Sequence, residues 1–189
     1  MEISSLRFMS TPTIDNSPAD QRSEKTIRTL IPQVQILARS LVHAAVATGI
    51  TIKVISGNRT FQQQDAIFLQ GRAPLATVNK ALIASGLNAI TQKDNKVRTK
   101  ARAGQSNHNF GIAFDVGIFK GSNFLEESPL YKAVAVLGKQ LGLTWGGDFH
   151  SIVDEPHYEL RPHWAVKMSE PKILAELRKR VAAKRDLFA

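Results

Sequence analysis

Short strand-like segments alternate at irregular intervals with amphipathic helical segments, and this pattern constrains the fold of the chain more than any other feature. The strand-like segments, short and rich in β-branched or aromatic residues, are 51–56, 112–118 and 157–160. Helical periodicity marks residues 22–48 (with a break near Pro32), 61–70, 130–141 and 170–184. Long loops of varied length separate these segments, which favours an α+β fold over a doubly wound parallel sheet.

The chain of 189 residues is of a size that fits one domain. Residues 1–21 are rich in Ser, Thr, Pro and Asp without sustained periodicity, so we expect a flexible N-terminal arm. The domain is then expected to span residues 22–189 and to end in a basic helix. Between them, a polar insertion at 73–100 with a short helix at 78–85 predicts a long surface excursion. A basic cluster overlaps its end, formed by Lys93, Lys96, Arg98, Lys100 and Arg102.

Composition restricts the chemistry and the partners. The chain has no cysteine, which excludes disulfides, a thiol nucleophile and a cysteine-ligated zinc finger. Its 25 Lys and Arg against 16 Asp and Glu give a net charge of +9, which favours a polyanionic partner such as nucleic acid, anionic lipid or bacterial cell wall. No apolar run is long enough to predict membrane insertion. The polar start lacks a Sec signal peptide, so we expect synthesis in the cytoplasm and delivery by another route.

The stretch SNHNFGIAFD at residues 106–115 is the most informative for chemistry. Strand alternation places Ile112, Phe114 and Val116 on one face, which can enter the core. Asp115 then lies on the other face between Ala113 and Gly117. Such small neighbours leave room for a metal ion or a substrate around the Asp115 carboxylate.

His108 stands seven residues before Asp115, an odd separation that would point the two side chains apart on an unbroken strand. Gly111 can supply the bend that brings them together, since glycine tolerates backbone angles that other residues avoid. His157 follows an acidic turn, and His108, Asp115 and His157 would make the three protein ligands of a catalytic zinc site, with a fourth position left for water. Asp154, just before His157, is placed to act as a base without being a ligand.

Spacing alone leaves open that these residues are ordinary solvated surface. The HExxH metalloprotease signature, the GxSxG nucleophile elbow and the P-loop are absent from the sequence. His43, on the first predicted helix, is most simply a residue of the helix surface.

Four segments taken together resemble the zinc peptidases of bacterial cell walls. These segments are SGNRTFQQQ (56–64), SNHNFGIAFD (106–115), LTWGGDF (143–149) and DEPHYEL (154–160). The family contains VanY-like D-alanyl-D-alanine carboxypeptidases, VanX-like dipeptidases and L-alanyl-D-glutamate endopeptidases, including phage endolysins. Its SxHxxGxAxD motif is matched at every fixed position by Ser106, His108, Gly111, Ala113 and Asp115.

The resemblance implies a small antiparallel sheet that carries the zinc site, flanked by helices, as in the VanX, VanY and hedgehog-like fold. It implies one Zn²⁺ ion, and the ligands that it implies are His108, Asp115 and His157. Asp154 corresponds to the general base, with its neighbour Glu155 left open as an alternative.

The resemblance also implies roles for residues that spacing did not single out. Arg59 matches an arginine that steadies the substrate carbonyl as it becomes an oxyanion, although Arg59 could instead only cap a strand end. Gln64 and Ser106 are expected to position backbone or substrate polar groups, and Trp145 to shape the substrate pocket and bind there. The nearby side chains of Asp148, His150 and His163 are weaker candidates: Asp148 for pocket shape, the two histidines as competing ligands.

We therefore expect a zinc metallopeptidase that hydrolyses an amide bond in the peptidoglycan stem peptide. The WGGDF and DEPHYEL variants favour an L-alanyl-D-glutamate endopeptidase, with a D-alanyl-D-alanine carboxypeptidase as the alternative. A basic wall-binding or nucleic-acid-binding module without catalysis is the competing class. Aromatic residues make up only 7% of the chain and none interleaves with the basic runs, so no specific nucleic acid is expected. The enzyme should act on the cell wall, in the periplasm or outside the cell, as a monomer.

Overall fold

The computed structural model describes residues 11–150 and 153–189, and their contacts divide the chain into two compact units. The first unit contains residues up to 57 together with 113–161, and the second contains 58–112 together with 162–189. Both units are therefore discontinuous in sequence. None of the helices in the described ranges is long and apolar enough to cross a membrane.

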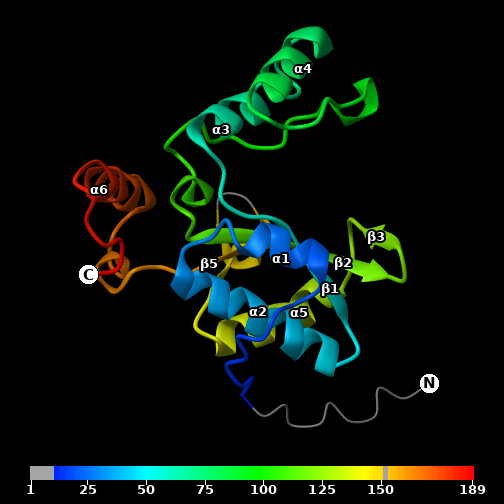
Figure 1. Cartoon of the computed structure of the whole chain (residues 1–189), viewed down its shortest axis with the longest axis vertical. Coiled ribbons are helices and arrows are strands. Elements are labelled where there is room, and N and C mark those ends of the chain that lie inside the picture. The colour runs from blue at the N-terminus through cyan, green and yellow to red at the C-terminus, as the bar shows by residue number, and fades with distance from the viewer. Residues whose placement is uncertain (1–10, 151–152) are drawn as a thin grey trace. The chain divides into compact units, whose positions relative to one another are not determined.

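An antiparallel sheet forms the centre of the first unit (Figure 1). Its strands are β1 (Thr51–Ser56), β2 (Ala113–Lys120), β3 (Asn123–Leu125), β4 (Thr144–Trp145) and β5 (His157–Glu159). The order is β1-β2-β5-β4, and β3 pairs with β2 beyond this path. The register pairs Asp115 of β2 with His157 of β5, and both β1 and β5 flank β2. The sheet thus places two of the expected ligands side by side.

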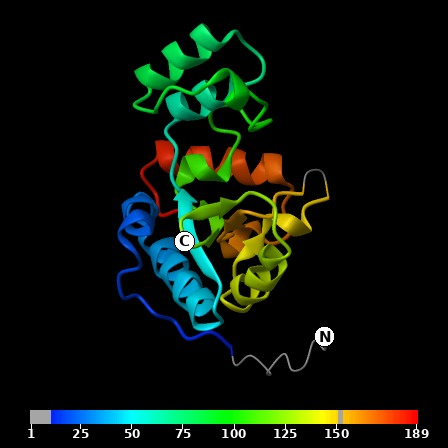
Figure 2. The ribbon, with the colours of Figure 1, turned by 90° about the vertical axis from the view of Figure 1, so that its right-hand side faces the viewer.

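Three helices pack in this unit: α1 (Gln21–Ile27), α2 (Pro32–Ala47) and α5 (Leu130–Gln140). Figure 2 shows α2 running alongside β1. The core face of α2 carries Val34, Ala38, Leu41 and Ala45, at a spacing of three or four residues, and all four are fully buried. Gly138 of α5 lies against the ring of Tyr158, where an added Cβ would come within 2.5 Å of a ring carbon. A close helix-to-sheet contact therefore requires glycine there.

The second unit contains α3 (Phe61–Phe68), α4 (Leu75–Ala84) and α6 (Glu170–Ala182). Short 3-10 turns complete the architecture: η1 (Gln92–Asp94), η2 (Asn107–Phe110) and η4 (His163–Ala165) in this unit, and η3 (Gly146–Asp148) in the first. Helices α3 and α4 share a small hydrophobic cluster built on Ala66, Val78 and Leu82. Two hydrogen bonds tie α6 to the segment before β2, from Asn107 to Glu170 (2.8 Å) and from Arg178 to the Gly104 carbonyl.

The α+β fold and the small antiparallel sheet confirm the expected class. The expected helix at 22–48 is broken before Pro32, which begins α2, as predicted. The helix expected at 78–85 begins earlier, at Leu75, because Pro74 at its N-cap fixes the entry and Val78 and Leu82 bury into the cluster shared with α3. The two-residue strand β4 and the turn η2 were not predicted.

The expected N-terminal arm lies partly outside the described residues, since residues 1–10 are not among them. Residues 11–20 make contacts with α2: the Asp15 backbone N–H donates to Ser40 Oγ (2.9 Å). Asp20 then caps α1 by accepting from the backbone of Arg22 and Ser23. Helix α1 begins at Gln21, the last residue of the expected arm.

Candidate metal centre

Asp115 lies on the face of β2 opposite the core, as strand alternation predicts. Ile112, Phe114 and Val116 are fully buried in the interior, whereas Asp115 is only half-buried. The sheet register places Asp115 beside His157, with Asp115 Oδ1 3.2 Å from His157 Nδ1. Neighbouring strands of one sheet therefore fix the relative positions of these two side chains.

Glu159, which is not among the residues expected from sequence, adds a second carboxylate next to His157. Residues two apart on a strand share a face, so His157 and Glu159 point the same way, while the ring of Tyr158 between them stacks on Phe114. Glu159 Oε2 lies 3.0 Å from His157 Nε2, and Arg161 Nε donates to the other oxygen of Glu159. The i,i+2 spacing in DEPHYEL was the signal that could have identified Glu159.

The two carboxylates make this part of the sheet favourable for positive charge. Burial of the His157 ring lowers its pKa, but the hydrogen bonds and charges of Asp115 and Glu159 outweigh burial, so that the pKa of His157 lies well above its usual range. An imidazole whose two nitrogens face carboxylates fits a bound cation: one nitrogen can ligate while the other donates to Glu159. The residues present therefore fit a metal ion.

His108 lies in η2, where it is buried to 3% exposure. Gly111 ends this turn with φ of 68°, a left-handed conformation that supplies the predicted bend between His108 and Asp115. One ligand atom from each of His108, Asp115 and His157 lies within 4.8 Å of the other two, and no other such group occurs in the described ranges. Two imidazoles and one carboxylate are a donor set that catalytic zinc sites use.

Asp154 lies on the exposed side of a tight turn that leads into β5. The His157 backbone N–H donates to the Asp154 carbonyl (3.2 Å), and the Asp154 N–H donates to the Gly146 carbonyl (3.0 Å). Trp145 Nε1 donates to the Glu155 carbonyl (2.7 Å). A Cβ at Gly146 would come within 2.5 Å of the Asp154 carbonyl, so the Trp-Gly-Gly segment holds the turn through contacts that only glycine permits.

Arg59 is half-buried in the segment just before α3. Its backbone N–H donates to the His108 carbonyl (3.0 Å), and Asn109 Nδ2 donates to the Arg59 carbonyl (2.9 Å). The backbones of Arg59 and of the proposed ligand His108 are thus fixed to one another. This explains why SGNRTF and SNHNF, far apart in sequence, act as one structural feature.

The three residues expected at the substrate occupy different environments. Gln64 is fully buried, and its amide donates to the Ala101 carbonyl (2.9 Å). Gln64 thus positions a backbone group, which is one of the two roles expected for it. Trp145 is 6% exposed, packs in the core of the first unit and contacts the 154–157 turn through its hydrogen bond to the Glu155 carbonyl. Ser106 is half-exposed at the start of η2, where its carbonyl accepts from the Asn109 N–H.

The weaker candidates lie apart from this group. His150 and His163 are exposed and do not belong to the group of metal-binding side chains found in the described residues. Asp148 pairs on the surface with Lys139 (3.1 Å). His43, in the last part of α2, is half-buried and its Nε2 lies 3.2 Å from Ser17 Oγ, which agrees with a residue of the helix surface.

The chain is similar to known peptidases of the bacterial cell wall. The family model described as D-alanyl-D-alanine carboxypeptidase matches residues 99–160, which include all three proposed ligands and Asp154. The peptidoglycan L-alanyl-D-glutamate endopeptidase CwlK of Bacillus subtilis (strain 168) is 32% identical over 144 residues, covering 71% of this chain and 75% of CwlK.

Two solved structures are also similar. The L-Ala D-Glu endopeptidase ChiX of Serratia marcescens has a TM-score of 0.48 at 20% identity and covers 75% of this chain and 87% of its own. The D,D-pentapeptidase VanY from a VanB-type vancomycin resistance cassette, solved with Zn(II), has a TM-score of 0.49 at 21% identity. The match covers 80% of this chain and 83% of the VanY chain.

The identity with CwlK extends over most of both chains, beyond the segment that the family model matches. The chain belongs to the family of zinc peptidoglycan peptidases that contains D-alanyl-D-alanine carboxypeptidases and L-alanyl-D-glutamate endopeptidases.

Proposed function

We propose that the chain is an L-alanyl-D-glutamate endopeptidase that cuts the stem peptide of peptidoglycan in the cell wall. The observation that carries this choice within the family is the similarity to CwlK, which is named for that activity and matches 71% of this chain. The grouping of His108, Asp115 and His157 supports metal-dependent hydrolysis.

His108, Asp115 and His157 would hold one zinc ion. When bound, zinc acts as a Lewis acid that polarises the scissile carbonyl and makes water a better nucleophile at neutral pH. Glu159 would accept a hydrogen bond from the nitrogen of His157 that does not ligate, which fixes the tautomer and the ring orientation. Arg161 in turn holds the Glu159 carboxylate.

Asp154 would take the proton from the attacking water and deliver it to the amine that leaves. Asp154 is suited to this role because a backbone hydrogen bond to Gly146 anchors its turn, while the residue itself is exposed. General acid–base catalysis of this kind typically contributes about 10²–10⁴-fold.

Arg59 would stabilise the negative charge that develops on the carbonyl oxygen. A guanidinium is always charged and presents donors in a fixed plane, so it acts most strongly when charge appears in the transition state. The hydrogen bonds that fix the Arg59 backbone to the His108 segment support a defined position for the start of this side chain.

The bond that is cut is tested by digesting purified peptidoglycan and identifying the new termini by mass spectrometry. Endopeptidase activity creates new carboxyl-terminal L-alanine residues and new amino-terminal D-glutamate residues. The alternative, a D-alanyl-D-alanine carboxypeptidase, is favoured by the description of the family model at 99–160. Release of free D-alanine with intact alanyl-glutamate bonds would establish that alternative.

A further inference from the structure

The basic loop, defined here as residues 91–102, has no part in the chemistry proposed above. It carries five basic side chains and one acidic side chain, that of Asp94. The Asp94 carboxylate accepts a hydrogen bond from Thr91 Oγ1 (2.6 Å) within the loop. The basic loop therefore contributes +4 to the chain's net charge of +9.

The backbone of the basic loop is held in place although it contains only the short turn η1. Asn95 accepts from the Gly71 N–H (2.8 Å) and donates to the Ala73 carbonyl (3.2 Å). Gln64 and Arg72 donate to the carbonyls of residues 101 and 99, each at 2.9 Å. A Cβ at Gly71 would come within 2.4 Å of the Val97 nitrogen, so the loop packs directly on the α3–α4 connection. A surface fixed in this way loses little conformational entropy when it binds a ligand.

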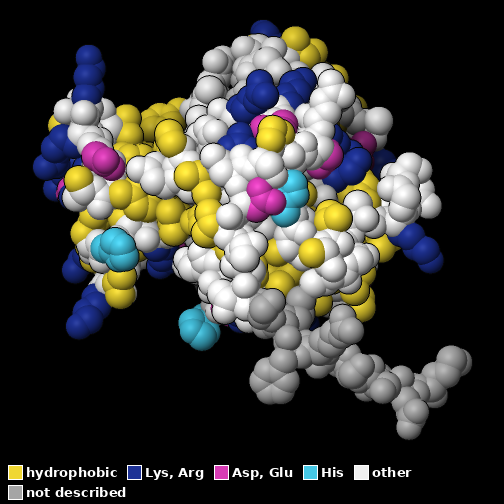
Figure 3. Space-filling view, turned by 60° about the horizontal axis from the view of Figure 1, so that its bottom comes forward, with side chains coloured by type: hydrophobic (Ala, Val, Ile, Leu, Met, Phe, Trp, Pro, Cys, Tyr) yellow, Lys and Arg dark blue, Asp and Glu magenta, His cyan; other side chains and the backbone are white. Residues whose placement is uncertain are grey.

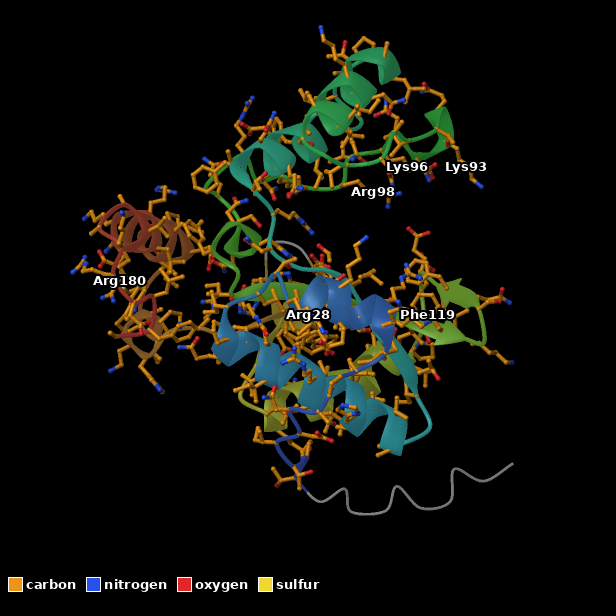
Figure 4. All side chains as sticks on the ribbon, in the orientation of Figure 1. Arg28, Lys93, Lys96, Arg98, Phe119 and Arg180 are labelled. Carbon is orange, nitrogen blue, oxygen red and sulfur yellow. The ribbon has the colours of Figure 1, made fainter. Side chains whose placement is uncertain are left out.

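The positive charges of the loop are presented outward. Lys93, Lys96 and Lys100 are exposed, and none of their side chains forms an ion pair or hydrogen bond in the described part of the chain. In Figure 4, Lys93, Lys96 and Arg98 lie along the loop on the side away from α4. In the view of Figure 3, basic side chains lie in separate groups with hydrophobic and uncharged surface between them.

The loop lacks a free aromatic platform for nucleotide bases. Residues 91–102 contain no aromatic side chain. The ring of Phe68, which contacts Arg102 of the loop, already stacks against the guanidinium groups of Arg72 and Arg102, 4.0 and 4.4 Å from its centroid. Binding of single-stranded nucleic acid usually depends on such rings. The loop is therefore suited to an anionic chain whose binding does not depend on base stacking, and a chain of carboxylates meets that condition.

We propose that the basic loop docks the acidic stem peptides of peptidoglycan, separately from the bond that is cut. This inference rests on the proposed function, because it takes peptidoglycan as the polymer in contact with the enzyme. Stem peptides carry free carboxylates at regular intervals, so several weak ion pairs to one polymer raise the local concentration of the enzyme on its substrate.

A binding assay on the full-length chain tests this proposal. Asp154→Ala is introduced first so that the polymer is not consumed, and binding to purified peptidoglycan, stripped of attached phosphate-containing polymers, is measured by sedimentation. In that background, Lys93→Glu, Lys96→Glu and Lys100→Glu together should weaken binding by about tenfold or more at low salt. Added salt should reduce the difference.

A matched control reverses the same number of charges elsewhere. Lys132, Lys172 and Lys179 are exposed lysines of α5 and α6, and their joint replacement by Glu should change binding by less than about twofold. Equal losses in the two triple variants, or no loss in the loop variant, would overturn the docking surface. Replacement of the loop lysines by Gln, with an unchanged melting temperature, separates lost charge from lost folding.

Two further measurements separate this proposal from its alternatives. With Asp154 intact, the loop variant should cleave a short soluble stem peptide at the wild-type rate. A wild-type chain that binds peptidoglycan through the loop but cleaves no stem peptide would refute the proposed function and retain the docking surface. Tighter binding of DNA than of peptidoglycan at equal salt, lost in the loop variant, would instead assign the loop to nucleic acid.

Discussion

Individual side chains in this chain divide into those proposed to bind zinc and those that position them. His108, Asp115 and His157 were expected from their spacing and from the family motif, and the structure brings them together. Glu159 was not expected, because a carboxylate in a short strand usually indicates a residue on the solvent-exposed face. Its burial to 1% exposure and its contact with His157 give it a role in orienting the ligand.

Asp154 and its neighbour Glu155 can be separated by substitution. Asp154→Ala should retain bound zinc and lower kcat by about 10²–10⁴-fold, because the proton acceptor is removed while the ligands remain. Glu155→Gln should retain most of the activity. Hydrolysis of a soluble stem peptide and elemental analysis for zinc measure both effects. Full activity in Asp154→Ala would remove it from the mechanism.

Glu159→Gln should lower zinc affinity by about 10–100-fold, because an amide is a weaker acceptor for the His157 N–H and no longer adds negative charge to the site. Competition with a chelator measures this directly, without reference to activity. Glu127→Gln, an exposed substitution of the same type, serves as the control. Equal zinc affinity in both variants would show that Glu159 serves packing alone.

At the scale of elements, strands and helices position the site through a few close contacts. The main strands and helices could be predicted because their periodicity is strong, and the bend at Gly111 was predicted because two ligands had to converge. The strand β4 and the turn η2 could not, because two to four residues carry no measurable periodicity. Their conformations depend on partners distant in sequence, such as Tyr158 opposite Trp145.

The turn before β5 depends on Gly146. Gly146→Ala should reduce activity by about 10²-fold, because the added Cβ would displace the Asp154 backbone and His157, which lie within 2.8 Å of it. Gly138→Ala is a suitable comparison, since its Cβ meets the Tyr158 ring at 2.5 Å on the core side. Both should lose about 1–3 kcal/mol of stability. Equal activity per folded molecule in the two variants would contradict the role of the turn.

Helices α1 and α2 are joined by an ion pair that makes stability depend on pH. Arg39 donates to both oxygens of Glu24, at 2.8 and 3.0 Å. Although burial opposes it, this pairing lowers the pKa of Glu24 from 4.5 to about 2. Because the pKa of Glu24 is lower in the folded than in the unfolded chain, its ionised carboxylate stabilises the fold at pH values above 4.5. This contribution is lost as the pH falls from 4.5 towards 2.

Glu24→Gln should therefore remove part of the acid sensitivity and destabilise the fold at neutral pH by about 1.5–3 kcal/mol, since a charged hydrogen bond is lost. Denaturant unfolding followed across this pH range measures both effects, with Glu127→Gln as the control. An unchanged slope of stability against pH below 4.5 would contradict the assignment to Glu24.

For the molecule as a whole, charge and chemistry belong to different parts of the sequence. The net charge of +9 suggested a polyanionic partner without saying which. Family membership makes that partner peptidoglycan, and the basic loop contains none of the residues proposed for catalysis or zinc binding. The positive charge of the basic loop is accordingly assigned to docking and not to catalysis. The family could be predicted from sequence because two of its four motifs carry the three proposed ligands, whereas the docking role needed the contacts that fix the loop.

Zinc held by His108, Asp115 and His157 is proposed to drive cleavage of the stem peptide. The most direct test is mass spectrometry of peptidoglycan digested by the purified chain, with and without a zinc chelator, and after zinc is restored. We predict new amino-terminal D-glutamate that disappears with the chelator and returns with zinc. The same products in the presence and absence of the chelator would contradict zinc-dependent cleavage.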